Sequence, residues 1–396
     1  MKKNFVFLLI IILATSCFIV NTKSENPLTS IIKVSELQYL SLIKGIGNSE
    51  KNPRSVTKDN RLKLVPSKDW TSGFFPGALW YLFESTKKDY WRNQAEKFTE
   101  RLEPEKFNNK THDMGFKMYC SFGNGYRLTK NEKYKKILLK SAQTLSTRFN
   151  PKVGCIRSWD FNKDVWQFPV IIDNMMNLEL LFWASEVSGD STYYKIAVSH
   201  ANTTMKNHFR KNYSTWHVVN YDTLTGKVIS KETHQGYSDS STWSRGEAWA
   251  LYGFTMCYRE TKNKKYLTEA ENIANFILTN KNLPTDGIPF WDFNAPNIPN
   301  AKRDASAAAI MASALYELSR FENEKSKSEY YKKFADKILS TLSSKNYFAK
   351  GNNHGFLLKH SVGNMPKMSE VDVPIIYADY YFLEANLRRL KIGNKY

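Results

Sequence analysis

Hydrophobic and polar positions alternate in long blocks along most of the chain. Each block opens on a polar or aromatic residue and continues as an apolar helix. A turn of Lys, Asn, Gly or Asp follows, and then a second helix led by tyrosine. The apolar helices begin at Trp70, Asp113, Asp173, Arg245 and Asp304, with a last one near Asp372. The leading tyrosines are Tyr90, Tyr134, Tyr194, Tyr266 and Tyr330. Each block therefore predicts a pair of antiparallel helices.

The two helices of a pair differ in polarity. Residues 178–187 are apolar around the whole helix, which indicates burial, whereas residues 134–142 are amphipathic with a lysine-rich face. Six inner and six outer helices, with residues 31–46 as the last outer helix, predict an all-α (α/α)6 barrel. An open solenoid is the alternative, but its concave face would expose these apolar helices. Strand signals occur only in short pieces, as at 214–221.

The opening residues of the inner helices are expected to meet. In a closed ring of helix pairs, every inner helix begins at the same end, so these residues converge there. They include carboxylates, imidazoles, an arginine and aromatic rings. The candidates are Trp70, His112, Asp113, Trp159, Asp173, His217, His234, Trp243, Arg245 and Trp249. Aromatic faces suit sugar rings, paired carboxylates suit acid–base chemistry on a sugar, and a planar guanidinium suits an anion.

Purely structural roles are the alternative to a chemical role for these residues. An Asp at a helix start is most often a cap, and we expect Asp304 and Asp372 to be caps or structural ion-pair partners. Asp173 differs because it is a lone charge in an apolar run, where an unpaired carboxylate is unfavourable, so it is either satisfied locally or functional. Gly115 beside Asp113 permits close approach of another chain segment or a ligand.

Composition and charge narrow the function. The chain has 396 residues, 42% of them hydrophobic and 24% charged, which is typical of a globular protein. Its net charge of +19 indicates an anionic partner or a solvated lysine-rich surface. No nucleic-acid-binding motif is present, so we expect no nucleic-acid partner. Cys120, Cys155 and Cys257 have no paired spacing, which predicts buried free thiols rather than disulfides or a metal site.

The first 17 residues predict export. Lys2 and Lys3 precede an apolar run at 5–14, and small residues then lead to Cys17. The segment resembles a bacterial lipoprotein signal with Cys17 as the lipidated residue; an ordinary cleaved signal is the alternative. We expect a periplasmic protein or an outer-membrane lipoprotein, in contact with a membrane only through that anchor. Residues 25–396 are expected to form one catalytic domain.

Several ordered motifs give the chain a family resemblance. They are Asp69-Trp-Thr-Ser-Gly-Phe-Phe-Pro-Gly, His112-Asp-Met-Gly-Phe, Ile171-Ile-Asp-Asn-Met-Met-Asn-Leu, Thr233-His-Gln-Gly, Ser241-Thr-Trp-Ser-Arg-Gly-Glu-Ala-Trp, Phe290-Trp-Asp-Phe, Arg303-Asp-Ala-Ser-Ala and Tyr377-Ala-Asp-Tyr-Tyr-Phe-Leu-Glu-Ala. Each motif is weak alone, but their shared order and spacing are specific. From about residue 70 to 388, the chain is similar to glycoside hydrolase family 88, the unsaturated glucuronyl hydrolases.

The resemblance implies a fold, a reaction and a set of roles. The fold is the (α/α)6 barrel. The substrate is a lyase-generated oligosaccharide with a 4,5-unsaturated uronate at its non-reducing end, and water adds across this enol ether. By resemblance, Asp173 is the general acid and base and Asp113 supports it, without metal or cofactor. His217 and Gln235 match positions that contact the sugar. The pocket wall is matched by Trp70, Trp159, Trp243, Arg245 and Trp249.

Two departures from the family pattern are visible. Glu247 stands where Gln is familiar, and we expect it to change only surface hydrogen bonding. The segment 359–370 is long and lies where the sugar beyond the cleaved bond is sensed, with His360, Ser361 and Lys367 as candidates. The positive charge suggests a sulfated, glycosaminoglycan-derived glycan. Two alternatives remain: an unsaturated rhamnogalacturonyl hydrolase of the same fold, and a non-catalytic surface lipoprotein that binds glycans.

Overall fold

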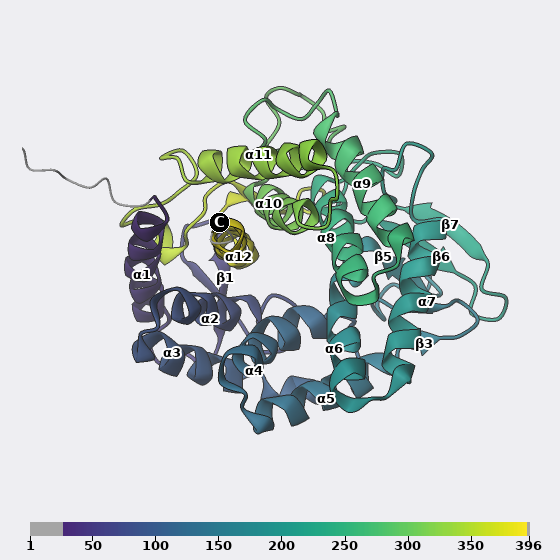
Figure 1. Ribbon diagram of the computed structural model, residues 1–396, viewed down its shortest axis with the longest axis horizontal. Helices are drawn as coiled ribbons and strands as arrows, with labels where there is room; N and C mark the ends of the chain where they lie inside the picture. The colour runs from purple at the N-terminus through teal and green to yellow at the C-terminus, as the bar shows by residue number, and fades with distance from the viewer. Residues whose placement is uncertain (1–26, 394–396) are drawn as a thin grey trace, which may run out of the picture.

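The computed structural model describes residues 27–393 as a ring of helices (Figure 1). The signal segment and Cys17 lie outside the described residues. Two concentric layers form the ring, as in an (α/α)6 barrel. The inner layer consists of α2 (Phe74–Thr86), α4 (Asn124–Thr129), α6 (Leu178–Ser188), α8 (Ser244–Thr261), α10 (Ala305–Ser319) and α12 (Ile376–Gly393). The outer layer consists of α3 (Asp89–Glu100), α5 (Glu132–Ser146), α7 (Ser191–Asn207), α9 (Lys264–Leu278), α11 (Lys325–Leu342) and α1 (Pro27–Ile46).

Two inner helices carry irregular turns at their starts. A π-helix, Gly115–Gly123, precedes α4, and a 3-10 helix, Ile172–Asn177, precedes α6. Gly115 permits the two starts to approach closely, because a Cβ atom there would lie 2.6 Å from the Cα of Asn177. The close approach expected at this glycine is therefore confirmed. The Asn177 side chain also accepts a hydrogen bond from the backbone N–H of Phe116 at 3.1 Å, so the starts of the two inner helices are joined.

The turns between inner and outer helices follow directly from the repeated Lys, Gly, Asn and Asp residues. An inner helix ends on a residue with positive φ, as at Lys130, Gly189 and Lys262. The next residue caps the outer helix: the Asn131 side chain accepts from the N–H of Lys133, and Asp190 and Asn263 act in the same way. These two-residue turns bring each outer helix back antiparallel to its inner partner.

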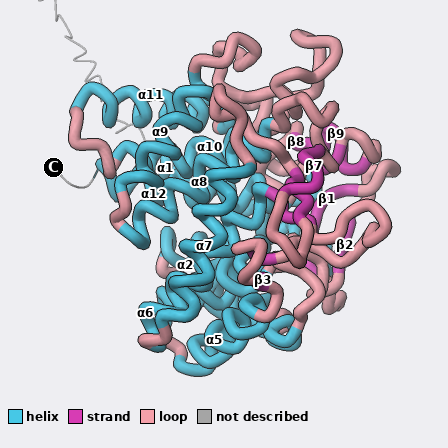
Figure 2. Tube along the Cα trace, turned by 90° about the vertical axis from the view of Figure 1, so that its right-hand side faces the viewer, coloured by secondary structure: helices cyan, strands magenta, loops and turns pink. Residues whose placement is uncertain are grey.

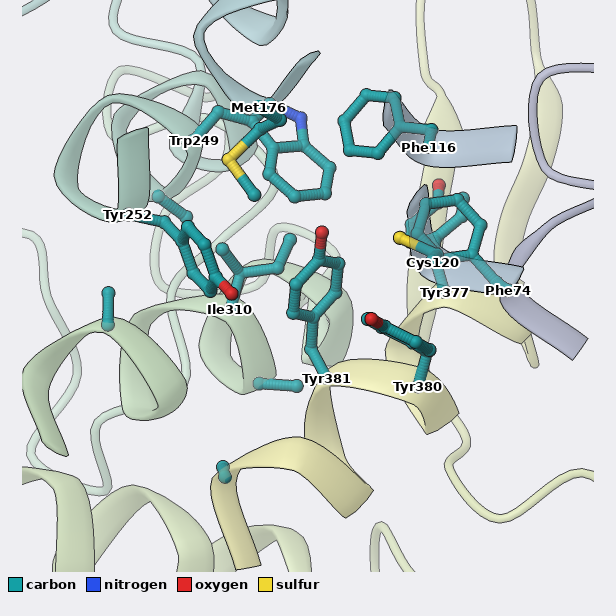
Figure 3. Packing of buried hydrophobic residues seen from close by; sticks show 14 of the residues in the cluster. Phe74, Phe116, Cys120, Met176, Trp249, Tyr252, Ile310, Tyr377, Tyr380 and Tyr381 are labelled. Atoms are coloured by element: carbon teal, nitrogen blue, oxygen red, sulfur yellow. The ribbon is translucent and has the colours of Figure 1, made fainter. Parts of the chain in front are cut away.

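Burial follows the predicted polarity of the helices. Every residue of α10 is buried, which explains its run of Ala and Ser, whereas α5 buries one face and exposes its lysines. Buried aromatic rings from several inner helices converge inside the ring (Figure 3). Tyr134 and Tyr266 are buried as outer-helix leaders, but Tyr90, Tyr194 and Tyr330 are exposed. Beside Tyr90 and Tyr330, the buried ring is one residue later, at Trp91 and Tyr331.

The strands are short and gather with the long loops at one end of the barrel (Figure 2). They form three two-stranded hairpins and one three-stranded sheet. The hairpins are β1 (Asn52–Val56) with β2 (Leu62–Val65), β3 (Phe149–Asn150) with β4 (Cys155–Ile156), and β8 (Ser361–Asn364) with β9 (Ser369–Val373). The sheet has the order β5 (Pro169–Ile171), β6 (Val218–Tyr221), β7 (Val228–Glu232), and all of its pairs are antiparallel. Short 3-10 helices occupy Glu103–Phe107 and Asn353–Gly355.

Three further expectations can be compared with the structure. Cys120, Cys155 and Cys257 are buried free thiols, as expected. Asp304 caps α10, accepting from the N–H of Ser306. The last inner helix, however, begins at Ile376 and not near Asp372, which lies in β9. Within residues 27–393, no helix combines the length and apolar character needed to cross a membrane.

Candidate active site

A cavity of about 670 Å³ opens at the end of the barrel where the inner helices begin. Many of the predicted site residues line it, although they come from distant parts of the chain. They are Trp70, His112, Asp113, Trp159, Asp173, His234 and Gln235. The convergence expected from the helix repeat is therefore present. Asp372, which was expected at the start of the last inner helix, does not line the cavity. Tyr377, in the first turn of that helix, lines it instead.

Asp173 is the most unusual group in this cavity. It lies in the first turn of the 3-10 helix that leads into α6, and it is only 7% exposed. Its Oδ2 has no hydrogen-bond partner in the described structure. Burial raises the pKa of this carboxyl to about 7, with a further rise from the charge of Asp113, against lowering by the charge of Arg245. Asp173 is therefore a carboxylic acid that still holds a proton near neutral pH.

Asp113 occupies the same cavity in a different state of solvation. Its side chain is partly exposed, and the hydroxyl of Thr111 donates a hydrogen bond to its Oδ2. On the other oxygen, Oδ1 lies 3.2 Å from Nε2 of His112. Burial lowers the pKa of His112, so this imidazole is neutral and serves as a hydrogen-bonding partner. Of the four acidic residues that line the cavity, Asp113 and Asp173 lie in contrasting environments, which suits division between an acid and a supporting carboxylate; the other two are Asp160 and Glu370.

His217 lies next to Asp173. Its Nδ1 accepts hydrogen bonds from the backbone N–H groups of His234 at 3.0 Å and Gln235 at 3.2 Å. These two donors require an unprotonated Nδ1, so the proton of the neutral ring is on Nε2. Nε2 lies 3.7 Å from Oδ2 of Asp173. Burial keeps the pKa of His217 well below its usual range, so the ring is neutral, and its Nε2–H lies near the Asp173 carboxyl without a hydrogen bond to it.

Trp243 and Trp249 support this group from within the protein. The Trp243 ring lies 4.5 Å from the ring of His217 and is 4% exposed. Trp249 is fully buried, with its ring 5.1 Å from that of Phe116 (Figure 3). Neither lines the cavity, whereas the family resemblance placed both in the pocket wall. Trp243 packs against His217, whereas the Trp249 side chain acts on Asp173 and lowers the pKa of its carboxyl. The aromatic rings that line the cavity are Trp70, Trp159 and the unpredicted Phe161 and Tyr377.

Arg245 also differs from its expected placement. It is fully buried, and its NH1 donates to Oδ2 of Asp304 at 3.0 Å while NH2 donates to the carbonyl of Gly363 at 2.6 Å. A third bond goes to the carbonyl of Val362. Both terminal nitrogens of the guanidinium are therefore occupied, Nε has no hydrogen-bond partner among the described residues, and Arg245 does not line the cavity. It instead joins α8 and α10 to the β8–β9 hairpin, which forms one side of the cavity.

Glu247 corrects the expectation of a surface change. Its side chain is fully buried, and Oε1 accepts bonds from the N–H of Thr215 at 2.7 Å and from the Thr215 hydroxyl at 2.8 Å. Burial raises the pKa of this carboxyl to about 7. Thr215 lies two residues before His217, so the Glu247 carboxyl fixes the segment that delivers the imidazole to Asp173.

Replacement of Glu247 tests this anchoring. Glu247→Gln keeps an acceptor for both Thr215 donors, so we expect little loss of activity. Glu247→Ala leaves the buried Thr215 N–H without a partner and should lower the free energy of unfolding by about 2 kcal/mol. A raised folded-state pKa means that wild type loses stability as pH rises from about 4.5 to about 7. Urea unfolding should therefore show that the free energy of unfolding of Glu247→Gln rises relative to that of wild type across this pH range. A difference between the two proteins that does not change with pH would contradict the raised pKa of Glu247.

The 359–370 segment places its three candidates differently. Lys367 lines the cavity, with Nζ 3.3 Å from Nε2 of His234. His360 lies outside it, where its Nδ1 pairs with Oδ1 of Asp372 at 2.6 Å, and Ser361 is buried. Gln235 links the hairpin to the site, since its Nε2 donates to the Gly363 carbonyl at 3.0 Å. Arg54 and Lys110 also line the cavity, and no sequence motif marked them.

Comparison with known proteins places this geometry in context. Residues 44–265 match the family model described as Glycosyl Hydrolase Family 88. An unsaturated glucuronyl hydrolase from Formosa agariphila is 52% identical over 372 residues, which cover 93% of this chain and 92% of that protein.

Solved structures agree with the sequence match. A crystal structure of an unsaturated glucuronyl hydrolase specific for heparin is 49% identical, with a TM-score of 0.88 over 92% of this chain and 97% of the other. A mutant of the enzyme from Streptococcus agalactiae, complexed with dGlcA-GalNAc6S, is 28% identical with a TM-score of 0.76 over 91% and 90% of the two chains.

Proposed function

The chain belongs to glycosyl hydrolase family 88, and on that premise we propose that Asp173 supplies the proton for hydration of an unsaturated uronate. The protein is a glycoside hydrolase that removes the 4,5-unsaturated uronic acid from the non-reducing end of lyase-generated oligosaccharides. The observation that carries the proposed role is the buried Asp173 carboxyl in the cavity, which has an unpartnered oxygen and a pKa that burial raises to about 7. An enol ether needs such an acid, because its carbon C4 must be protonated before water can add.

The reaction requires no direct attack on the glycosidic bond. Asp173 donates its proton to C4, and positive charge develops at C5 and the ring oxygen. Water adds at C5 and loses a proton to the Asp173 carboxylate, which restores the acid. The C5 hemiketal then opens to a ketone, leaving a hemiacetal at C1 that collapses to an aldehyde and releases the next sugar. One water is consumed for each uronate removed.

The surrounding residues divide the remaining tasks. The Nε2–H of His217 lies near the Asp173 carboxyl, and the neutral state of the ring avoids drawing the proton away. Asp113 is the second carboxylate, positioned to contact substrate hydroxyl groups and to stabilise developing positive charge. Trp70 and Trp159 offer flat faces to the sugar. Lys110 and Lys367 supply positive charge at the cavity for an anionic substrate.

We further propose that the natural substrate is a sulfated glycosaminoglycan fragment. The heparin-specific relative at 49% identity and the lysines at the cavity support this choice. The purified protein should be mixed with unsaturated glucuronyl disaccharides, sulfated and unsulfated, and with unsaturated galacturonyl ones. The absorbance of the conjugated double bond should fall fastest with the sulfated glucuronyl substrate, with release of one sugar per bond lost. Equal rates on sulfated and unsulfated substrates would contradict the sulfate preference, and persistent absorbance would contradict the activity.

We propose that the protein is exported and anchored through Cys17. The charged start, the apolar run and the small residues before Cys17 support this placement. Radiolabelled palmitate should enter the full-length protein expressed in a bacterial host, and Cys17→Ser should abolish the label. Equal labelling of both forms would contradict the anchor.

A further inference from the structure

Asp292 lies in a sequence motif to which the proposed reaction gives no role. It is fully buried and does not line the reaction cavity. The motif, 290–293, packs against the β7–α8 loop, residues 233–242: the N–H of Phe293 donates to the carbonyl of Thr242 at 2.9 Å. A buried carboxyl group is unfavourable unless its oxygens accept hydrogen bonds. The donors to Asp292 therefore show which segment it supports.

Both oxygens of Asp292 accept hydrogen bonds. Oδ2 accepts from the N–H of Tyr237 at 2.9 Å and from the hydroxyl of Ser241 at 2.7 Å. Oδ1 accepts from the N–H of Thr242 at 3.3 Å and from that of Asn294 at 2.8 Å. Three of these four donors belong to the β7–α8 loop. The carboxyl of Asp292 therefore holds that loop from a position outside the cavity.

The start of the β7–α8 loop reaches the ring of His217. The backbone N–H groups of His234 and Gln235 both donate to its Nδ1, at 3.0 and 3.2 Å. Gly236 follows directly, and a Cβ atom there would lie only 3.1 Å from Oδ2 of Asp292. The loop thus joins the buried carboxyl to the imidazole, with no room for a side chain at the glycine.

These contacts determine which nitrogen of His217 carries the proton. Two N–H donors at Nδ1 require that nitrogen to be unprotonated, which leaves the proton of the neutral ring on Nε2. Nε2 lies 3.7 Å from Oδ2 of Asp173. In the other tautomer, Nε2 would present a lone pair to Asp173 and compete with C4 of the substrate for its proton. The loop that Asp292 holds therefore favours the tautomer that leaves the acid free to react.

We propose that Asp292 is a positioning residue that keeps His217 protonated on Nε2 and so keeps Asp173 available as the acid. The proposal rests on the proposed function, in which Asp173 protonates C4 of the unsaturated uronate. Asp292 acts only through the loop, since it lies outside the cavity. Its replacement should therefore change two quantities together: the tautomer of His217 and kcat.

Nitrogen-15 NMR of histidine-labelled protein measures the tautomer directly. Seven histidines contribute signals, and those missing in His217→Gln assign the ring. Wild type should show only the Nε2-protonated form. Asp292→Asn replaces one accepting oxygen by an NH₂ group, so at least one N–H of the β7–α8 loop loses its acceptor. We expect both tautomers in this variant, and kcat on an unsaturated disaccharide should fall about 10-fold.

A second variant displaces the loop without removing a hydrogen-bond acceptor, and it tests the proposal even if Asp292→Asn does not fold. Gly236→Ala places a methyl group 3.1 Å from Oδ2 of Asp292 and 2.6 Å from Oγ1 of Thr233. The loop must shift to relieve these contacts, which moves its N–H groups relative to Nδ1 of His217. We therefore expect mixed tautomers and a lower kcat here as well.

Asp379→Asn is the matched control. Asp379 is also fully buried, and its oxygens accept from two backbone N–H groups, those of Leu357 at 2.8 Å and Leu358 at 2.9 Å. None of these residues belongs to the β7–α8 loop, so this variant should keep His217 in a single tautomer.

Several results would overturn the proposal. They are a wild-type His217 protonated on Nδ1, a single tautomer in both loop variants, equal mixing of tautomers in Asp379→Asn, and mixed tautomers without a fall in kcat. The spectra need no substrate. If wild type fails to consume disaccharide, the proposed function fails, while NMR still decides whether Asp292 sets the tautomer of His217.

Discussion

Asp173→Asn is expected to lower kcat by about 10³-fold or more while the protein stays folded. The amide has nearly the shape of the carboxyl group but has no acidic proton to give to C4. Asp173 has few interactions to lose, because its Oδ2 has no hydrogen-bond partner. Loss of double-bond absorbance under saturating substrate measures the effect, and circular dichroism and thermal unfolding report the fold.

The stability of this variant provides the control. The pKa of Asp173 is raised to about 7 in the folded protein, so the neutral form is favoured there. The preference of the folded protein for the neutral carboxyl contributes to the free energy of unfolding below about pH 4, and this contribution is lost as pH rises to about 7. At pH 8 the variant should therefore have a Tm equal to or above that of wild type. A normal kcat would disprove the role of Asp173, and a collapsed Tm would show that the carboxyl supports the fold instead.

Arg245→Met is expected to lower the free energy of unfolding by about 3–5 kcal/mol. The change leaves Asp304 buried without its cation and removes two hydrogen bonds to the β8–β9 hairpin. We also expect a higher KM, because that hairpin forms one side of the cavity. Denaturant unfolding and disaccharide kinetics measure the two effects.

A double variant separates this structural role from substrate binding. Arg245→Met with Asp304→Asn removes both buried charges, and Asn retains an acceptor for the cap of α10. It should recover most of the lost stability, since replacing a buried ion pair by neutral groups is often nearly neutral. Two outcomes would indicate that Arg245 instead binds the substrate anion. In the first, the double variant regains no stability; in the second, Arg245→Met loses substrate affinity while its free energy of unfolding stays unchanged.

The helical repeat was predictable from the sequence because it depends on local patterns. Apolar inner helices, amphipathic outer helices and capped turns each follow from a few neighbouring residues, as Lys130 and Asn131 illustrate. Ring closure then brings the inner-helix starts together, which is why Asp113 and Asp173 meet in one cavity. The same reasoning applied to the true start of α12 would have identified Tyr377.

The environment of buried charges was not predictable from local pattern. The sequence does not reveal that Arg245 faces Asp304 on the neighbouring inner helix instead of the cavity. Nor does it reveal that Glu247 turns inward to Thr215. Both contacts join segments far apart in the chain, and either direction is compatible with a motif at a helix start. Arg54 was missed because the segment around the β1–β2 hairpin carries no catalytic motif.

The pH dependence of kcat/KM tests most directly the claim that protonated Asp173 drives the reaction. Because the acid form is required, kcat/KM should fall above an apparent pKa of about 7 and approach a tenfold loss per pH unit. The profile should be recorded with an unsaturated disaccharide at constant ionic strength, with Tm measured at each pH to verify folding. A value of kcat/KM that stays constant or rises from pH 7 to pH 9 would contradict the role of Asp173 as the proton donor.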